Sequence, residues 1–67
     1  MIIYLDILQK LADKGWTAYK LRQEKIIGEA TMTRIRKGEP IKTDTIDKIC
    51  GLLNCQPSDL LKWERDE

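Results

Sequence analysis

The chain has 67 residues, a mass of 7.8 kDa and a formal net charge of +1, with 42% hydrophobic and 34% charged residues. A chain of this length forms one domain, residues 1–67, with a small core and little room for an enzyme pocket. It has no apolar run of the roughly 18–20 residues that span a bilayer, and residues 1–8 lack the features of a secretory signal. We therefore expect a cytoplasmic globular domain without a membrane partner.

Missing residue types exclude much chemistry. The sequence has no histidine, which removes His-dependent general-base catalysis and imidazole metal sites. Cys50 and Cys55 do not form a CxxC pair, and two sulfurs alone cannot complete a tetrahedral zinc site. We expect both thiols to fill small apolar positions, and we expect no enzymatic activity, no metal and no cofactor.

The first predicted element is a helix that ends before Gly15. Its buried face is marked by apolar residues at helical spacing, namely Tyr4, Ile7, Leu8, Leu11 and Ala12. A cation at Lys14, followed by a glycine that readily takes a left-handed conformation, is typical of a helix C-terminus.

Two further helices are predicted on either side of a break at 26–28. Thr17 is a suitable N-cap for the first of them, which runs from about Ala18 to Glu24 or Lys25. The second runs over 29–37 and ends at Gly38. Two short helices joined by a tight turn are the elements of a helix-turn-helix unit.

Two helices complete the predicted fold. Thr43 is the expected N-cap of a helix that ends at Asn54, and Pro57 is expected to open a last short helix through Trp63. No stretch alternates long enough to indicate a sheet. The fold class predicted is therefore all-α, a compact bundle of five helices.

The segment WTAYKLRQEKIIGEATMTRIRKGE, residues 16–39, combines this spacing with positive charge. Its apolar residues can hold two helices at a steep angle: Leu21, Ile27, Met32 and Ile35. Residues 17–42 hold seven basic and three acidic side chains, whereas residues 43–67 hold three basic and six acidic ones. A protruding helix with cationic flanks fits the major groove of B-DNA, which is about 12 Å wide.

This segment resembles the helix-turn-helix domains of the phage repressor and Cro family, the XRE group. A second block, TDTIDKICGLLNCQPSDLL, resembles the family's fourth helix, the turn after it and the start of the fifth, so the resemblance covers residues 5–62. Three positions depart from the pattern. Arg22 stands where the family prefers Ala, Lys25 where a hydrophobic residue is common, and Ile26 in place of the usual turn Gly. The resemblance implies a lambda-repressor-like bundle.

The family's docking on DNA implies which residues contact it. Base reading would belong to exposed positions of the 29–37 helix, namely Glu29, Ala30, Thr33 and Arg34. An arginine can donate to guanine O6 and N7, and a glutamate can accept from cytosine N4. Phosphate binding would belong to Thr17, Ala18, Tyr19, Arg36, Lys37 and Lys42. Each of these could instead be an ordinary solvated surface residue.

The resemblance implies a sequence-specific DNA-binding transcriptional regulator, most simply a repressor, encoded by a bacterium or phage and bound to double-stranded DNA. One such unit reads few base pairs, so we expect a homodimer on two half-sites, paired through the apolar residues of 1–4 and 61–63. The alternative is an antitoxin-like or accessory module that keeps the fold and holds a protein partner such as a toxin. The acidic last third and the three departures favour this alternative.

Overall fold

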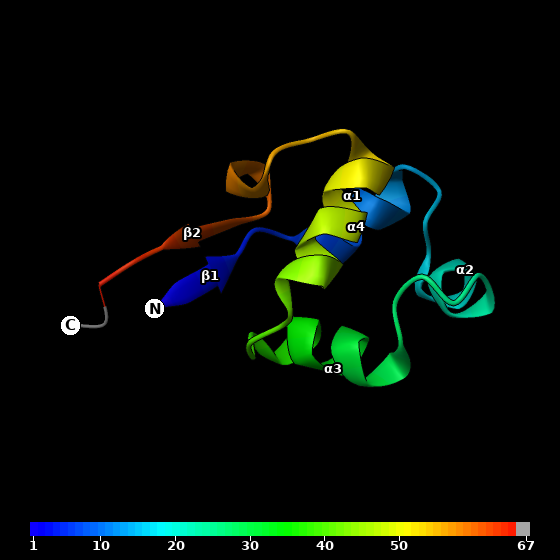
Figure 1. The fold of residues 1–67 in the computed structure, drawn as a ribbon, viewed down its shortest axis with the longest axis horizontal. Coiled ribbons are helices and arrows are strands. Elements are labelled where there is room, and N and C mark those ends of the chain that lie inside the picture. The colour runs from blue at the N-terminus through cyan, green and yellow to red at the C-terminus, as the bar shows by residue number, and fades with distance from the viewer. Residues whose placement is uncertain (66–67) are drawn as a thin grey trace.

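The computed structural model describes residues 1–65, and within them the chain is mostly helical with one small sheet (Figure 1). In chain order the elements are β1 (Ile2–Tyr4), α1 (Ile7–Asp13), α2 (Ala18–Gln23), α3 (Glu29–Lys37), α4 (Thr43–Leu53), the 3-10 helix η1 (Pro57–Asp59) and β2 (Leu61–Trp63). No helix in this part of the chain is long and apolar enough to cross a membrane.

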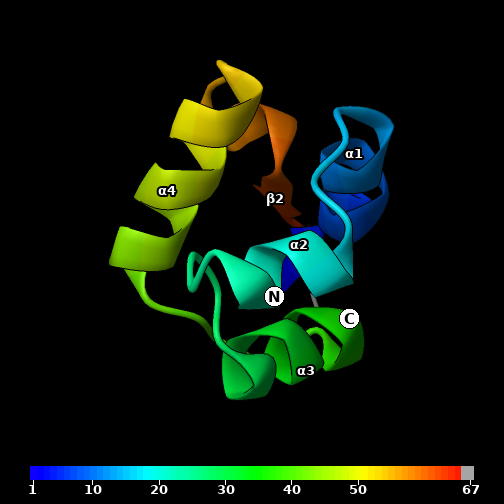
Figure 2. The same ribbon diagram turned by 90° about the vertical axis from the view of Figure 1, so that its right-hand side faces the viewer.

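The four α-helices enclose a small apolar core. α1 packs against α4 and α3, and α2 and α3 lie together at the end of the molecule opposite η1 (Figure 2). The buried side chains are Ile7, Leu11, Leu21, Ile27, Met32, Ile35, Ile49 and Leu60. The four residues predicted to hold the helix-turn-helix together are among them, so that prediction is confirmed. Burial of each such side chain contributes about 1.5–3 kcal/mol.

Most helix ends follow the local signals in the sequence. The Thr17 hydroxyl accepts a hydrogen bond from the Lys20 N–H at 3.3 Å and caps α2. Gly15 and Gly38 follow α1 and α3 with φ of 89° and 74°, a left-handed conformation that glycine adopts without strain. Asn54 ends α4 with φ of 53°.

Two helix starts were predicted wrongly. α1 begins at Ile7, so Tyr4 lies in β1 and not on the face of a helix. The N-cap of α4 is Lys42, and Thr43 is already helical because the Lys42 carbonyl accepts the N–H of Thr45 at 3.0 Å.

The predicted fifth helix is the main error in the fold. Residues 57–59 form one 3-10 turn, closed by a reciprocal capping box between Gln56 and Asp59, and the chain then becomes extended. Strand β2 pairs antiparallel with β1 in the register Ile2↔Trp63, Ile3↔Lys62 and Tyr4↔Leu61. So few residues cannot sustain a helix in water, whereas a strand beside β1 satisfies its backbone groups.

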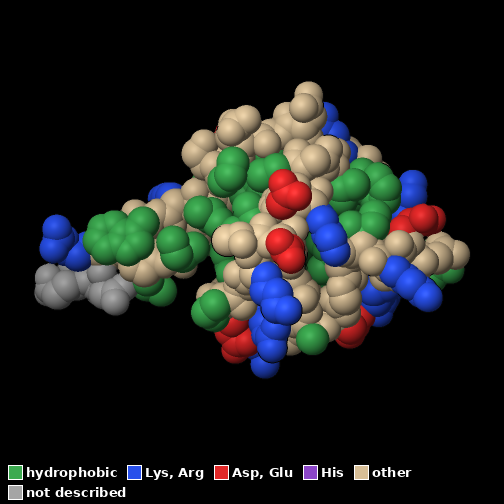
Figure 3. Space-filling view, in the orientation of Figure 1, with side chains coloured by type: hydrophobic (Ala, Val, Ile, Leu, Met, Phe, Trp, Pro, Cys, Tyr) green, Lys and Arg blue, Asp and Glu red, His purple; other side chains and the backbone are tan. Residues whose placement is uncertain are grey.

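The two strands form an arm that extends away from the helices (Figures 1 and 3). Because side chains alternate along a strand, the apolar face of this sheet consists of Ile2, Tyr4, Leu61 and Trp63. Ile2 and Trp63, at the outer end, remain 47% and 65% exposed. Tyr4 and Leu61, at the inner end, are half-buried.

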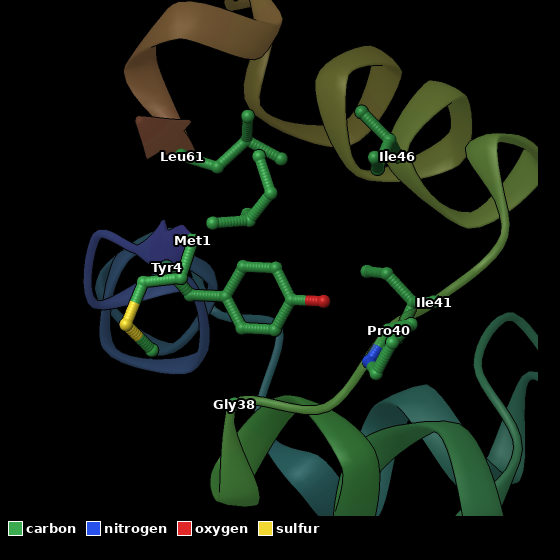
Figure 4. A pocket seen from close by; sticks show the side chains of 8 residues that line it. Met1, Tyr4, Gly38, Pro40, Ile41, Ile46 and Leu61 are labelled. Atoms are coloured by element: carbon green, nitrogen blue, oxygen red, sulfur yellow. The ribbon is translucent and has the colours of Figure 1, made fainter. Parts of the chain in front are cut away.

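An open apolar cavity of about 460 Å³ lies between this sheet face and the loop from α3 to α4. The Tyr4 ring projects into it from β1, toward Ile41 and away from Met1 (Figure 4). The Tyr4 hydroxyl donates a hydrogen bond to the Glu39 carbonyl at 2.5 Å, which ties the arm to the end of α3.

Candidate nucleic-acid interface

Helices α2 and α3 form a helix-turn-helix unit joined by residues 24–28. Leu21 and Met32 are fully buried, and Ile27 in the turn is nearly so, so an apolar contact fixes the two helices relative to each other. α3 lies at the edge of the molecule (Figures 1 and 2). Its core-facing residues are Met32 and Ile35, which leaves the opposite side of the helix to solvent.

The turn between the helices differs from the one expected. The left-handed residue is Lys25, with φ of 58°, and not Ile26, where the family pattern places its glycine. Ile26 instead packs partly buried against the core, and its N–H donates to the Leu21 carbonyl at 3.0 Å. The left-handed residue of the turn therefore comes one position earlier than in the family pattern. The Ile26 side chain is thus available to pack against the core.

The four predicted base-reading residues lie on the outer side of α3. Glu29, Ala30 and Arg34 are exposed, and Thr33 is half-buried. Within residues 1–65, the Arg34 side chain has no ion pair or hydrogen bond. The Thr33 hydroxyl is already used, because it donates to the Glu29 carbonyl at 3.1 Å.

The predicted phosphate-binding residues fall into two groups. Thr17, Ala18 and Tyr19 stand at the start of α2, where the Tyr19 ring is 67% exposed and one backbone N–H is taken up by the Thr17 cap. Arg36, Lys37 and Lys42 are exposed at the end of α3 and the start of α4. These three cations therefore lie in the last turn of α3 and just before α4.

Sequence reasoning missed one interaction at this surface. Arg22, in the last turn of α2, places its Nη1 3.0 Å from Oε1 of Glu29, the first residue of α3. The signal that could have predicted this contact is the pair of opposite charges on the two sides of the predicted turn.

The two cysteines lie away from this surface, near the end of α4. Both are half-buried and pack against the core, and the Cys55 N–H donates to the Cys50 carbonyl at 3.1 Å. Burial, followed by the neighbouring Cys55 thiol, raises the pKa of the Cys50 thiol, so it stays protonated at neutral pH. Among the described residues, no group of three or more Cys, Asp or Glu side chains is placed to hold a metal ion.

Comparison with known proteins agrees with this geometry. Residues 6–66 match the family model of the Cro/C1-type HTH DNA-binding domain. The chain belongs to this family. The Cro/C1-type match includes α2, α3 and α4, so the helix-turn-helix unit described above is a DNA-binding domain.

This Cro/C1-type chain is also 30% identical over 69 aligned positions to a protein of Bacillus subtilis (strain 168), described as "Uncharacterized HTH-type transcriptional regulator YozG". The alignment covers 100% of this chain and 80% of the relative. No solved structure matches this member of the family.

Proposed function

We propose that the protein is a sequence-specific transcriptional regulator, a repressor that inserts α3 into the major groove of double-stranded DNA. One observation carries the proposal: Arg34 projects from the exposed side of α3 and is bonded to nothing else in residues 1–65. An arginine in this setting can donate to guanine O6 and N7. The description of the B. subtilis relative as a transcriptional regulator supports the same role.

The other contacts follow from the same docking. Base reading is shared by Glu29, Ala30, Thr33 and Arg34, with the Ala30 methyl suited to a thymine methyl. Phosphate contacts come from Thr17, Ala18, Tyr19, Arg36, Lys37 and Lys42. Such contacts set the orientation of α3 in the groove, and the base contacts set the sequence. We propose that the protein acts in the cytoplasm of a bacterium or a phage-infected cell, where it would meet such DNA.

Selection of bound duplexes from a random library, followed by fluorescence-anisotropy titration, tests this function. We expect binding to the selected duplex to exceed binding to a scrambled one by about 10³-fold at the same salt concentration. Equal affinity for the two duplexes would contradict sequence-specific binding. A promoter–reporter assay tests the sign of regulation: increased transcription from a promoter that carries the selected site would contradict repression.

We further propose that two copies bind together, paired through the sheet arm. Ile2 and Trp63 are exposed at its outer end, and Met1 beside them is 57% exposed. A dimer lets two α3 helices reach half-sites about one helical turn apart, roughly 34 Å. Analytical ultracentrifugation of the protein with a duplex that carries two half-sites should show two protein copies per duplex. W63K places a charge on the pairing surface, so it should reduce the number of copies per duplex to one.

The alternative function is an antitoxin-like module that holds a partner protein on the same apolar arm. The exposed sheet face is the observation that favours it. This function predicts no binding to random duplex DNA at tens of micromolar protein and low salt. Binding in that assay would count against it.

A further inference from the structure

The contact between Arg22 and Glu29 joins the two helices of the helix-turn-helix unit. It crosses from the last turn of α2 to the first residue of α3, over the turn that contains the left-handed Lys25. The Arg22 and Glu29 side chains are 48% and 59% exposed, so both can be reached by a ligand on the α3 face.

Arg22 is the side chain that fixes the Glu29 carboxylate among the described residues. The N-cap before Glu29 is Gly28, which has no side chain to bond to it. The Thr33 hydroxyl bonds the Glu29 backbone carbonyl and not its carboxylate. Only Oε1 of Glu29 is used by Arg22, so Oε2 keeps its capacity to accept a hydrogen bond.

The Arg22–Glu29 pair contributes little to folding stability, because exposed ion pairs contribute only about 0–1 kcal/mol. Its effect on binding to DNA can be larger than its effect on folding. A lone carboxylate at the head of α3 would be repelled by the phosphates, and the Arg22 guanidinium offsets that charge. Exclusion of water from the groove also strengthens the contact between the two groups.

We propose that Arg22 is a specificity-determining positioning residue for DNA. It holds the Glu29 carboxylate by Oε1, so that Oε2 accepts a hydrogen bond from the N4 amino group of a cytosine in the major groove. This inference rests on the proposed insertion of α3, and it adds a residue of α2 to the set that determines base preference.

The experiment measures affinity for the selected duplex and for its three single-base variants at the position where Glu29→Gln alters preference. Arg22→Ala should lower the preference for cytosine there by about fivefold, as expected for loss of about one kcal/mol of discrimination. Arg22→Lys should restore part of that preference, because it keeps the charge. In a Glu29→Ala background, which leaves no acceptor for Arg22 to hold, Arg22→Ala should affect the four duplexes equally.

Arg36→Ala is the matched control, because it should weaken all four duplexes alike. Circular dichroism and the thermal midpoint check that each variant folds, and Glu29→Gln tests the acceptor without touching Arg22. An unchanged base preference in Arg22→Ala, or no effect of Glu29→Gln at any position, would overturn the role of Arg22. A wild-type protein with no base preference would instead refute sequence-specific binding itself.

Discussion

Arg34 is the side chain on which base recognition depends most. It leaves the exposed side of α3 without an internal partner in residues 1–65, so binding to a base requires no existing bond to break. We expect Arg34→Ala to weaken binding to the selected duplex by about 1–3 kcal/mol and to remove preference at one base pair. Anisotropy titrations with single-base variants measure both quantities. Equal losses on selected and scrambled duplexes would contradict a base-reading role.

Lys37 lies one helical turn beyond Thr33 and has a different predicted role, contact with a phosphate. Lys37→Ala should weaken binding to all sequences by a similar factor and lower the slope of log K against log salt by about 1. Titration of the same duplexes at several salt concentrations checks this. A change of base preference without a change of slope would assign Lys37 to the bases instead.

Lys25 is held in a conformation that most residues avoid. A left-handed backbone costs a non-glycine residue about 1–2 kcal/mol, and Lys25 has this conformation. Glycine would avoid that cost, but it has more conformational freedom in the unfolded chain, which offsets part of the gain in stability. Lys25→Gly should therefore raise the free energy of unfolding by about 0.5–1 kcal/mol, measured by urea denaturation. Lys14 has φ of −98° beside the end of α1, so Lys14→Gly should bring no gain. Equal effects of the two changes would contradict this account of the turn.

At the scale of single elements, α2 depends on its cap. It has only six residues, too few to be stable alone, and the Thr17 hydroxyl satisfies one of its unbonded N–H groups. Thr17→Ala should lower the free energy of unfolding by about 0.5–2 kcal/mol, whereas Thr17→Ser should retain most of it. Urea denaturation of both variants makes the comparison. Equal stability of the alanine and serine variants would show that the hydroxyl does not cap the helix.

The four α-helices and most of their ends could be predicted because their signals are local. The spacing of apolar residues, the Thr17 cap and the glycines at 15 and 38 act within one or two turns. The sheet could not be predicted, because three-residue strands are too short for alternation to be visible and each is stabilised by the other.

The candidate site shows the same division. Exposure of Ala30 and Arg34 followed from the period of α3, since their positions oppose Met32 and Ile35, and Glu29 is exposed at the first position of the helix. The Arg22–Glu29 contact depends on how the turn brings two helices together, and that turn has its left-handed residue at Lys25, one position before the glycine of the family pattern. The roles of the site residues on DNA stay predictions.

For the whole molecule, the net charge of +1 hides a basic surface near α3 and an acidic last third. Three basic side chains predicted to contact phosphates, at 36, 37 and 42, imply a slope of log K against log salt of about −3 per protomer. Titration of non-specific duplex between low and moderate salt measures this slope. A slope near zero would contradict phosphate binding by this surface.

The sheet arm joins segments from distant parts of the chain, as the hydrogen bond between Met1 and Glu64, 63 positions apart, illustrates. Closing so long a loop has a large entropic cost, so contacts between distant segments form slowly. Helices and neighbouring turns form from local contacts, which carry a smaller cost. The local contacts within α2, the turn and α3 can therefore start to form earlier in folding than the pairing of β1 with β2. The arm is completed only once residues 61–63 have left the ribosome and reached β1, so any assembly that uses the arm has to wait for both strands to pair.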